Sequence, residues 1–383
     1  MRLSVLLTLF FCTSMVAANA AERAFETTVT REDIQAQYVW AGQGGERVQV
    51  LVMPGHEPDF GGTELGGLKE RDIMVLLGEK IASHLRTDPR IEVTIARTKE
   101  TWHPKLGKYF EDEWWEIKDF VTQKKREMKR ALRKGDVEER TFEVGHNTAA
   151  TDVALRLYGI NKWASERGFD IVIHPHLNDN GGAQFHSGFA VYVPDREYGN
   201  ADASRPLGEA IAYELNAYNA SSTLPIENYA IVEDQSLIAL GAFNTADFAS
   251  VLIEYAYIYE SKIKNSEARD AVLTDMAYQT YRGIMNYLGA PVTGSNTLAL
   301  PRIWISSNLP LKTSDPQVYA LQVALKKIGF YPPSGELLIG CPISGYMGEC
   351  TKRALKAFQA SQGFEQTGTI GPKTKAVLES IAP

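Results

Sequence analysis

The sequence lacks a polybasic tract. Its 40 Lys and Arg residues are outnumbered by 47 Asp and Glu residues, which gives a formal net charge of -7. This pattern does not indicate nucleic-acid binding, and mild acidity alone identifies no partner. After the N-terminus no segment is apolar for long enough to span a membrane. Cysteine is also scarce, with three residues in 383.

The N-terminus is typical of a secretory signal peptide. Met1-Arg2 is a short positive start, Leu3 to Ala17 is mainly apolar, and Ala18-Asn19-Ala20 is a small-residue cleavage site. The apolar run is short for a bilayer span, and Thr and Ser interrupt it. We therefore predict that residues 1–20 are removed and that the mature chain is exported, to the periplasm or to the outside of the cell.

Removal of the signal would take Cys12 with it and leave Cys341 and Cys350. In an oxidising compartment such a pair more often forms a disulfide than a reactive site. We expect a Cys341–Cys350 bridge that closes a small loop.

Strand and helix patterns alternate through most of the chain. Strands are predicted at 48–53, 91–96, 171–173, 188–193 and 250–253, and helices at 67–85, 147–167, 203–218 and 262–288. This alternation predicts an α/β domain with a largely parallel sheet flanked by helices.

The chain divides into segments of different character. An uncertain lead-in, 21–46, precedes the α/β domain at 47–289. Residues 290–312 are a linker rich in Gly, Pro, Ser and Asn. Residues 313–383 form a small helical domain, with helices expected at 316–328, 349–362 and 373–381. A disulfide staple suits a domain of this size.

A highly charged helical insertion is expected at 105–140. Apolar residues recur in it at helical spacing: Phe110, Trp114, Ile117, Val121, Met128 and Leu132. One interpretation is a helix that packs this stripe on the domain. The other is a movable lid over the active site.

Five residues whose side chains could bind a metal or act in catalysis lie at the ends or starts of predicted elements. His56 follows the strand 48–53, and Glu70 begins the next helix. His174 and His176 end the third strand, and Glu254 follows the apolar run Val-Leu-Ile. Functional groups of α/β sheets gather at the carboxyl ends of strands, so these side chains are candidates for one site.

The residue types indicate a zinc hydrolase. A carboxylate such as Glu254 is costly beside an apolar core unless it is ion-paired, metal-bound or protonated. A single histidine at a strand end is more often structural than a ligand. Two histidines and two glutamates together are more informative: catalytic zinc takes three N or O ligands, and a remaining carboxylate can accept a proton from water.

Four motifs in order resemble a known family. They are Leu51-Val-Met-Pro-Gly-His56, Gly67-Leu-Lys-Glu70, Asp170-Ile-Val-Ile-His-Pro-His176-Leu-Asn178 and Val251-Leu-Ile-Glu254. The segment from about Val48 to Leu288 is similar to the zinc-dependent N-acetylmuramoyl-L-alanine amidases of bacterial cell separation. The resemblance implies that His56, Glu70 and His176 bind Zn²⁺ and that Glu254 is the catalytic carboxylate.

The same resemblance separates the neighbouring histidines. Counted from Asp170, His176 falls on the ligand position, and His174 falls where the family usually has a small residue. His174 and Asn178 are therefore expected to support a ligand or to face the substrate. The family usually has Gly-Gly after Pro-Gly-His, whereas Glu57-Pro58 follow here. Glu57 and Asp59 are therefore expected to alter the rim of the site.

The C-terminal segment resembles the three-helix peptidoglycan-binding domain. The similarity lies in Asp315 to Gly329, Gly345 to Thr351, Ala357-Phe-Gln359 and Thr367 to Thr374. Together the two resemblances imply an enzyme that hydrolyses the amide bond between N-acetylmuramic acid and L-alanine in peptidoglycan. The alternatives are a zinc peptidase that cuts the stem peptides and a catalytically inactive wall-binding regulator. The sequence names no activating partner.

Overall fold

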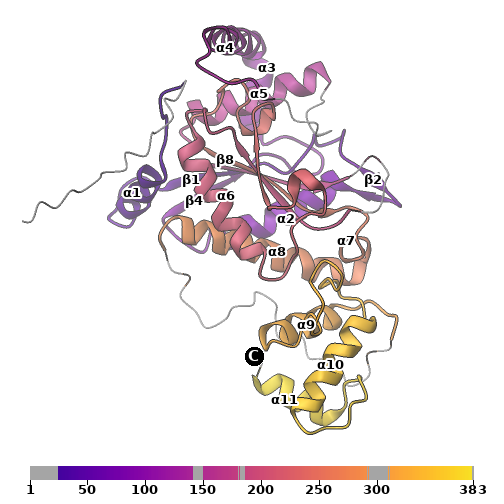
Figure 1. The fold of residues 1–383 in the computed structure, drawn as a ribbon. Helices are drawn as coiled ribbons and strands as arrows, with labels where there is room; N and C mark the ends of the chain where they lie inside the picture. The colour runs from indigo at the N-terminus through magenta and orange to yellow at the C-terminus, as the bar shows by residue number, and fades with distance from the viewer. Residues whose placement is uncertain are drawn as a thin grey trace, which may run out of the picture.

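The computed structural model describes residues 25–140, 150–179, 181, 186–290, 292, 309 and 311–381 (Figure 1). The predicted signal peptide and most of the predicted linker lie outside these residues. Within the described ranges, no helix combines the length and apolarity that crossing a membrane requires.

A six-stranded sheet with the order β4-β1-β5-β8-β6-β7 forms the centre of the larger domain. Its strands are β1 (Val48–Val52), β4 (Ile91–Ile95), β5 (Ile171–Asn178), β6 (Ala190–Pro194), β7 (Ile231–Asp234) and β8 (Ala249–Tyr257). Every neighbouring pair is parallel except β6 with β8. The predicted α/β class with a largely parallel sheet is confirmed.

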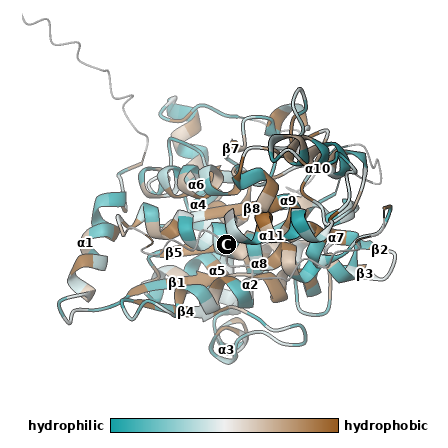
Figure 2. Ribbon diagram, turned by 90° about the horizontal axis from the view of Figure 1, so that it is seen from below, coloured by the Kyte–Doolittle hydropathy of each residue, from teal (hydrophilic) through white to brown (hydrophobic). Residues whose placement is uncertain are grey.

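Helices cover both faces of this sheet. On one face lie α2 (Glu70–Leu85), α6 (Ala201–Leu215) and α8 (Ser266–Tyr287), and on the other α3 (Pro104–Asp112), α4 (Trp114–Lys134) and α5 (Thr151–Glu166). Successive strand residues point to opposite faces, so β1 packs Val50 and Val52 under the first group and Leu51 under the second. The flanking helices accordingly alternate between hydrophilic and hydrophobic segments (Figure 2).

The remaining elements are short or peripheral. They are α1 (Arg31–Ala41), α7 (Ser261–Lys264), the 3₁₀ turns η2 (Pro225–Glu227) and η3 (Ile238–Leu240), and a hairpin of β2 (Glu64–Leu65) and β3 (Leu68–Lys69). Helix α1 lies in the segment that the sequence left unassigned. Thr30 and Asp33 form a capping box at its start, which satisfies backbone N–H groups that would otherwise lack partners.

Several predicted boundaries are wrong around the candidate site. Helix α2 begins at Glu70 rather than Gly67, because residues 68–69 pair in the hairpin. Strands β5 and β8 continue to Asn178 and Tyr257, because their hydrogen-bonded ladder extends beyond the apolar runs. His174, His176 and Glu254 therefore lie within strands, not after them.

The C-terminal domain contains α9 (Pro316–Lys327), α10 (Glu349–Ser361) and α11 (Pro372–Ile381). Its core includes Leu321, Leu325, Leu355 and Phe358. Cys341 and Cys350 form the expected disulfide. The domain packs against α8, where the buried Tyr319 hydroxyl donates to Asp275 Oδ2 at 2.9 Å.

At the start of β5, a largely buried carboxylate joins two strands. Asp170 Oδ2 accepts a hydrogen bond from the backbone N–H of Gln49 at 2.7 Å. Burial raises the pKa of Asp170 to about 6 from 3.8, with this hydrogen bond opposing the rise. The folded state therefore favours the protonated carboxyl, and stability is lost as the pH rises from about 4 to about 6.

Asp170→Asn is expected to stabilise the protein above pH 6, where the wild-type side chain is a partly buried anion. The amide oxygen of asparagine can still accept from Gln49. The gain in the free energy of unfolding at pH 8 should be on the order of 1–3 kcal/mol and should vanish near pH 4. Thermal unfolding at both pH values measures it. A gain of the same size at pH 4 would exclude titration of Asp170 as its cause.

Candidate metal centre and active site

One pocket, of about 590 Å³, collects every site residue that the motifs predicted. Its lining includes His56, Glu70, His174, His176, Asn178 and Glu254. Apolar side chains such as Val153 and Leu157 of α5 line it as well. A concave, partly apolar pocket with a few convergent polar groups is the usual form of an active site.

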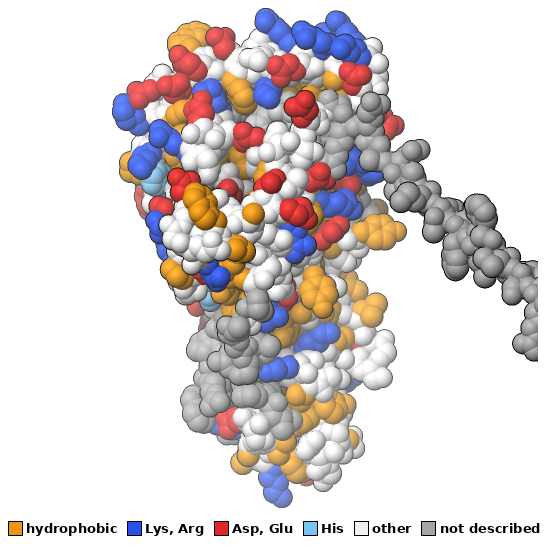
Figure 3. Space-filling model, turned by 90° about the vertical axis from the view of Figure 1, so that its left-hand side faces the viewer, with side chains coloured by type: hydrophobic (Ala, Val, Ile, Leu, Met, Phe, Trp, Pro, Cys, Tyr) orange, Lys and Arg blue, Asp and Glu red, His pale blue; other side chains and the backbone are white. Residues whose placement is uncertain are grey.

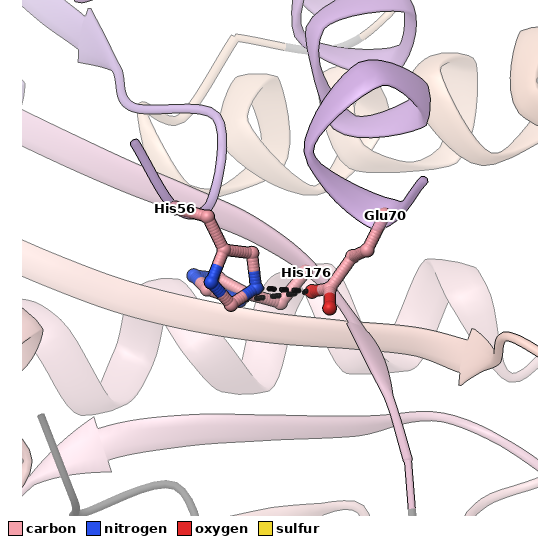
Figure 4. A group of neighbouring side chains, drawn as sticks. All are labelled: His56, Glu70 and His176. Carbon is pink, nitrogen blue, oxygen red and sulfur yellow. Dashed lines mark hydrogen bonds and ion pairs between the residues drawn. The ribbon is translucent and has the colours of Figure 1, made fainter. Parts of the chain in front are cut away.

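Three side chains from separate elements converge in this pocket (Figure 4). His56 comes from the loop after β1, Glu70 is the first residue of α2, and His176 comes from β5. Their potential ligand atoms all lie within 4.8 Å of one another. Glu70 Oε1 is 2.8 Å from His56 Nε2 and 3.2 Å from His176 Nδ1. Two imidazoles and a carboxylate arranged in this way could hold a metal ion.

Glycines make room for both imidazole rings. A Cβ atom at Gly55 would lie 2.5 Å from the ring of His176, and one at Gly62 would lie 2.7 Å from the ring of His56. His56 itself has a φ of 71°, a left-handed conformation that is uncommon for a residue with a side chain. The backbone at His56 is thus in an unfavourable conformation that directs its side chain toward Glu70, and such strain is common at functional sites.

Glu70 is the buried anion of the group, with 2% of its surface exposed. The backbone N–H groups of Thr63 and Leu177 donate to its two carboxylate oxygens, each at 3.0 Å. Burial favours the neutral acid, but the charges and hydrogen bonds of His56 and His176 outweigh it and hold the pKa of Glu70 well below its usual range. An ionised carboxylate at a helix N-terminus also interacts favourably with the helix dipole.

Glu254 lies beside His176 across the sheet. The two residues are register partners in the parallel pair of β5 and β8, so their side chains leave the same face. Glu254 is 3% exposed and lines the pocket. Between His176 and Asn178 the register of the two strands shifts, because β8 has one more residue than β5 over this step. The sheet therefore places a second carboxylate next to the group of three.

His174 lies two residues before His176 on the same strand, and it is not part of the group of three. It is buried and makes a hydrogen bond with the backbone of Ala239. Its Nε2 has no hydrogen-bond partner among the described residues. Burial, with a smaller contribution from His176, lowers the pKa of His174 to about 3. A neutral imidazole therefore lines the pocket at neutral pH.

Arg97 is a buried residue of the site that the motifs did not identify. Its Nε donates to the carbonyl of Pro54 at 3.0 Å, and its Nη2 donates to the carbonyls of Gly55 and Arg71. These bonds connect the loop that carries His56 to the helix that Glu70 begins. Burial lowers the pKa of Arg97 to about 10, so it stays cationic at neutral pH. Its position after the strand 91–96 was the available sequence signal.

Glu227 is a second residue that sequence reasoning missed. It is fully buried, and its Oε1 accepts from Asn178 Nδ2 at 2.8 Å and from the Tyr192 hydroxyl at 2.7 Å. The Tyr257 hydroxyl donates to its other oxygen at 3.1 Å. This network fixes the amide of Asn178 at the wall of the pocket. Glu227 lies in a 3₁₀ turn outside any periodic pattern, so the sequence carried no signal for it.

The rim of the pocket carries an ion pair at the position where the family usually has Gly-Gly. Glu57 lines the pocket and pairs with Arg156 of α5 at 2.9 Å. Burial raises the pKa of Glu57, and Arg156 opposes the rise. None of the described lining residues comes from α3 or α4. Ile117, Val121 and Met128 of α4 are instead buried against the domain, which favours the packed helix over the lid.

Comparisons with known proteins agree with these features. Residues 118–286 match the family described as N-acetylmuramoyl-L-alanine amidase, and residues 314–378 match a putative peptidoglycan binding domain. No curated protein matches the chain.

Similar solved structures include amidases of three bacteria. The N-acetylmuramoyl-L-alanine amidase of Clostridium difficile has 16% identity and a TM-score of 0.40, with 65% of this chain and 100% of that chain covered. The N-acetylmuramoyl-L-alanine amidase of Nostoc punctiforme has 18% identity and a TM-score of 0.40, with 64% of this chain and 99% of that chain covered. The amidase of Mycobacterium smegmatis has 14% identity and a TM-score of 0.43, with 64% of this chain and 98% of that chain covered.

The two matched segments lie in the two domains of the fold, the first in the α/β domain and the second over α9 to α11. Both concern the bacterial cell wall, which implies action outside the cytoplasm. The chain thus carries an N-acetylmuramoyl-L-alanine amidase domain, which acts on peptidoglycan, and a C-terminal peptidoglycan-binding domain.

Proposed function

We propose that His56, Glu70 and His176 bind a catalytic zinc ion and that Glu254 is the proton acceptor in hydrolysis of the bond between N-acetylmuramic acid and L-alanine. The observation that carries this proposal is the convergence of the three ligand atoms within 4.8 Å. His56 and Glu70 precede the matched segment 118–286, so their assignment rests on the geometry and on the motifs around them.

The donor set suits zinc, which takes imidazole nitrogen and carboxylate oxygen and keeps an open position when three protein groups bind it. When bound, zinc supplies a Lewis acid that polarises a carbonyl oxygen and makes water more acidic. In this proposal Glu254 takes up a proton from the attacking water and returns it to the departing amine.

Other residues of the pocket hold the substrate and the ligands. Glu227 orients the amide of Asn178, which faces the substrate or supports the ligand His176. The neutral His174 offers a ring nitrogen for hydrogen bonding from the pocket wall. The Glu57–Arg156 pair places charged groups at the rim of the pocket.

The domain plan explains how the enzyme meets its substrate. An exported precursor loses residues 1–20, and the catalytic domain at 47–289 is followed by a linker at 290–312 and a wall-binding domain at 313–383. Peptidoglycan is a solid polymer, so a domain that holds it raises the effective concentration of bonds near the active site. The enzyme thus works in the periplasm or outside the cell, attached to the wall.

Glu254→Gln is expected to lower the rate of amide hydrolysis at least 100-fold, because a neutral amide cannot accept the proton. Zinc binding and the fold should persist. Digestion of purified peptidoglycan, followed by identification of new amino-terminal alanine, measures the activity. A wild-type rate in the variant would remove Glu254 from the mechanism. New ends within the stem peptide would instead identify a peptidase.

His176→Ala is expected to lose zinc far more than His174→Ala, because only His176 belongs to the group of three. The affinity should fall by more than about 100-fold in the first variant and by less in the second. Equilibrium competition with a chelator measures both affinities. The reverse order would show that His174 is the ligand.

Arg97→Lys is expected to weaken zinc binding by about 10- to 100-fold, as changes in groups that orient metal ligands do. Lysine keeps the charge, but its single ammonium cannot reach the carbonyls of Pro54, Gly55 and Arg71 together. The same chelator competition measures it, and the exposed Arg86→Lys is the matched control. Equal affinities for both variants would contradict this role of Arg97.

A further inference from the structure

The C-terminal half of α4 has a charge opposite to that of the whole protein. Between residues 123 and 134 there are seven Lys and Arg residues and one Glu, although the chain has a net charge of -7. Six of the seven are exposed: Lys125, Arg126, Lys129, Arg130, Arg133 and Lys134. In the space-filling view, Lys and Arg side chains gather at the top of the molecule, where α4 lies in Figure 1 (Figure 3).

These cations share the outer face of α4 with an exposed tryptophan. At 100° per residue, Trp115, Arg126, Lys129, Arg130 and Arg133 fall on one side of the helix, opposite the buried Ile117, Val121 and Met128. The Trp115 side chain is 73% exposed, and the ammonium of Lys118 lies 4.3 Å from the centre of its ring. The outer face thus combines basic residues with a large aromatic ring, and Asp119 is the acidic residue on it.

Interactions within the protein do not explain why all of these basic residues lie on this face. Lys124 has an acidic neighbour, Glu127, at 3.9 Å, and Lys125 lies over the rings of Tyr158 and Phe243. Arg133 and Lys134 complement the helix dipole in the last turn. Arg126, Lys129 and Arg130 lie farther from the helix end, and in the described parts of the chain no ion pair holds them.

We propose that the outer face of α4, defined as Trp115, Arg126, Lys129, Arg130 and Arg133, docks on an anionic phospholipid bilayer. The apolar face of α4 is packed on the domain, so the contact would be made by the basic cluster, which anionic lipids attract, and by the exposed Trp115, which favours the lipid–water interface. Figure 1 draws α4 at the opposite end of the molecule from α9–α11. The enzyme can therefore contact the membrane with one end and the wall with the other.

The tryptophan favours a bilayer over a dissolved anionic polymer as the partner. Basic side chains attract either one, but an exposed indole gains most at a lipid–water interface, where its apolar body is buried and its N–H stays hydrated. Each Lys or Arg near an anionic surface contributes roughly fivefold to binding. Four of them with one indole give a reversible attachment that weakens as salt is added.

The test uses the mature chain loaded with zinc and vesicles of equal parts phosphatidylglycerol and phosphatidylcholine. We expect cosedimentation with these vesicles and none with pure phosphatidylcholine. Replacing Arg126, Lys129, Arg130 and Arg133 by Gln should weaken the partition at least about 100-fold. Trp115→Ala should weaken it about 10-fold and reduce the blue shift of tryptophan fluorescence on binding.

A matched control removes four exposed cations elsewhere: Arg86, Arg167, Lys264 and Lys327 to Gln. It has the same net charge as the α4 variant and should bind the vesicles like the wild type. Circular dichroism and hydrolysis of peptidoglycan verify that both variants fold. Equal losses in the two variants would overturn the proposal, as would a wild-type protein that ignores the anionic vesicles. Loss of sacculus binding alone in the α4 variant would identify a wall polymer as the partner.

Discussion

Burying the Glu70 carboxylate at the start of α2 is unfavourable unless positive or hydrogen-bonding groups surround it. His56 and His176 supply two such groups, and two backbone N–H groups supply the others. The same contacts draw the loop after β1, the hairpin before α2 and the strand β5 to one point. The electrostatic requirement of one acid thus helps to determine where three segments meet, and the meeting point is the proposed metal centre.

The sheet carries the rest of the site because its register is fixed by the apolar residues beneath it. His176 and Glu254 are neighbours across β5 and β8, so the distance between a ligand and the second carboxylate does not depend on any flexible loop. Glu227 holds the side-chain amide of Asn178, and Arg97 holds the carbonyl of Pro54. Such rigidity suits a catalyst, because groups placed in advance cost no reorganisation during the reaction.

The two ends of the molecule present different surfaces. At one end the disulfide-closed helical domain packs on α8 through Tyr319 and Asp275, in a contact that is buried and hydrogen-bonded. At the other end α4 turns a basic face outward while its apolar stripe anchors it to the domain. An enzyme that attaches at both ends in the proposed way is oriented between wall and membrane.

The sequence by itself determined the α/β class, the residues of the four motifs, the paired cysteines and the three C-terminal helices, because these depend on local periodicity and residue type. Only the tertiary structure decided that β5 and β8 continue through the site and that α2 begins at Glu70. It also decided that Arg97 and Glu227 hold groups around the site in place. The start of α2 depends on the pairing of residues 68–69 in the hairpin, and the other features depend on hydrogen bonds between segments far apart in the chain. A local pattern cannot encode such bonds, since each partner satisfies the other only after the sheet has formed.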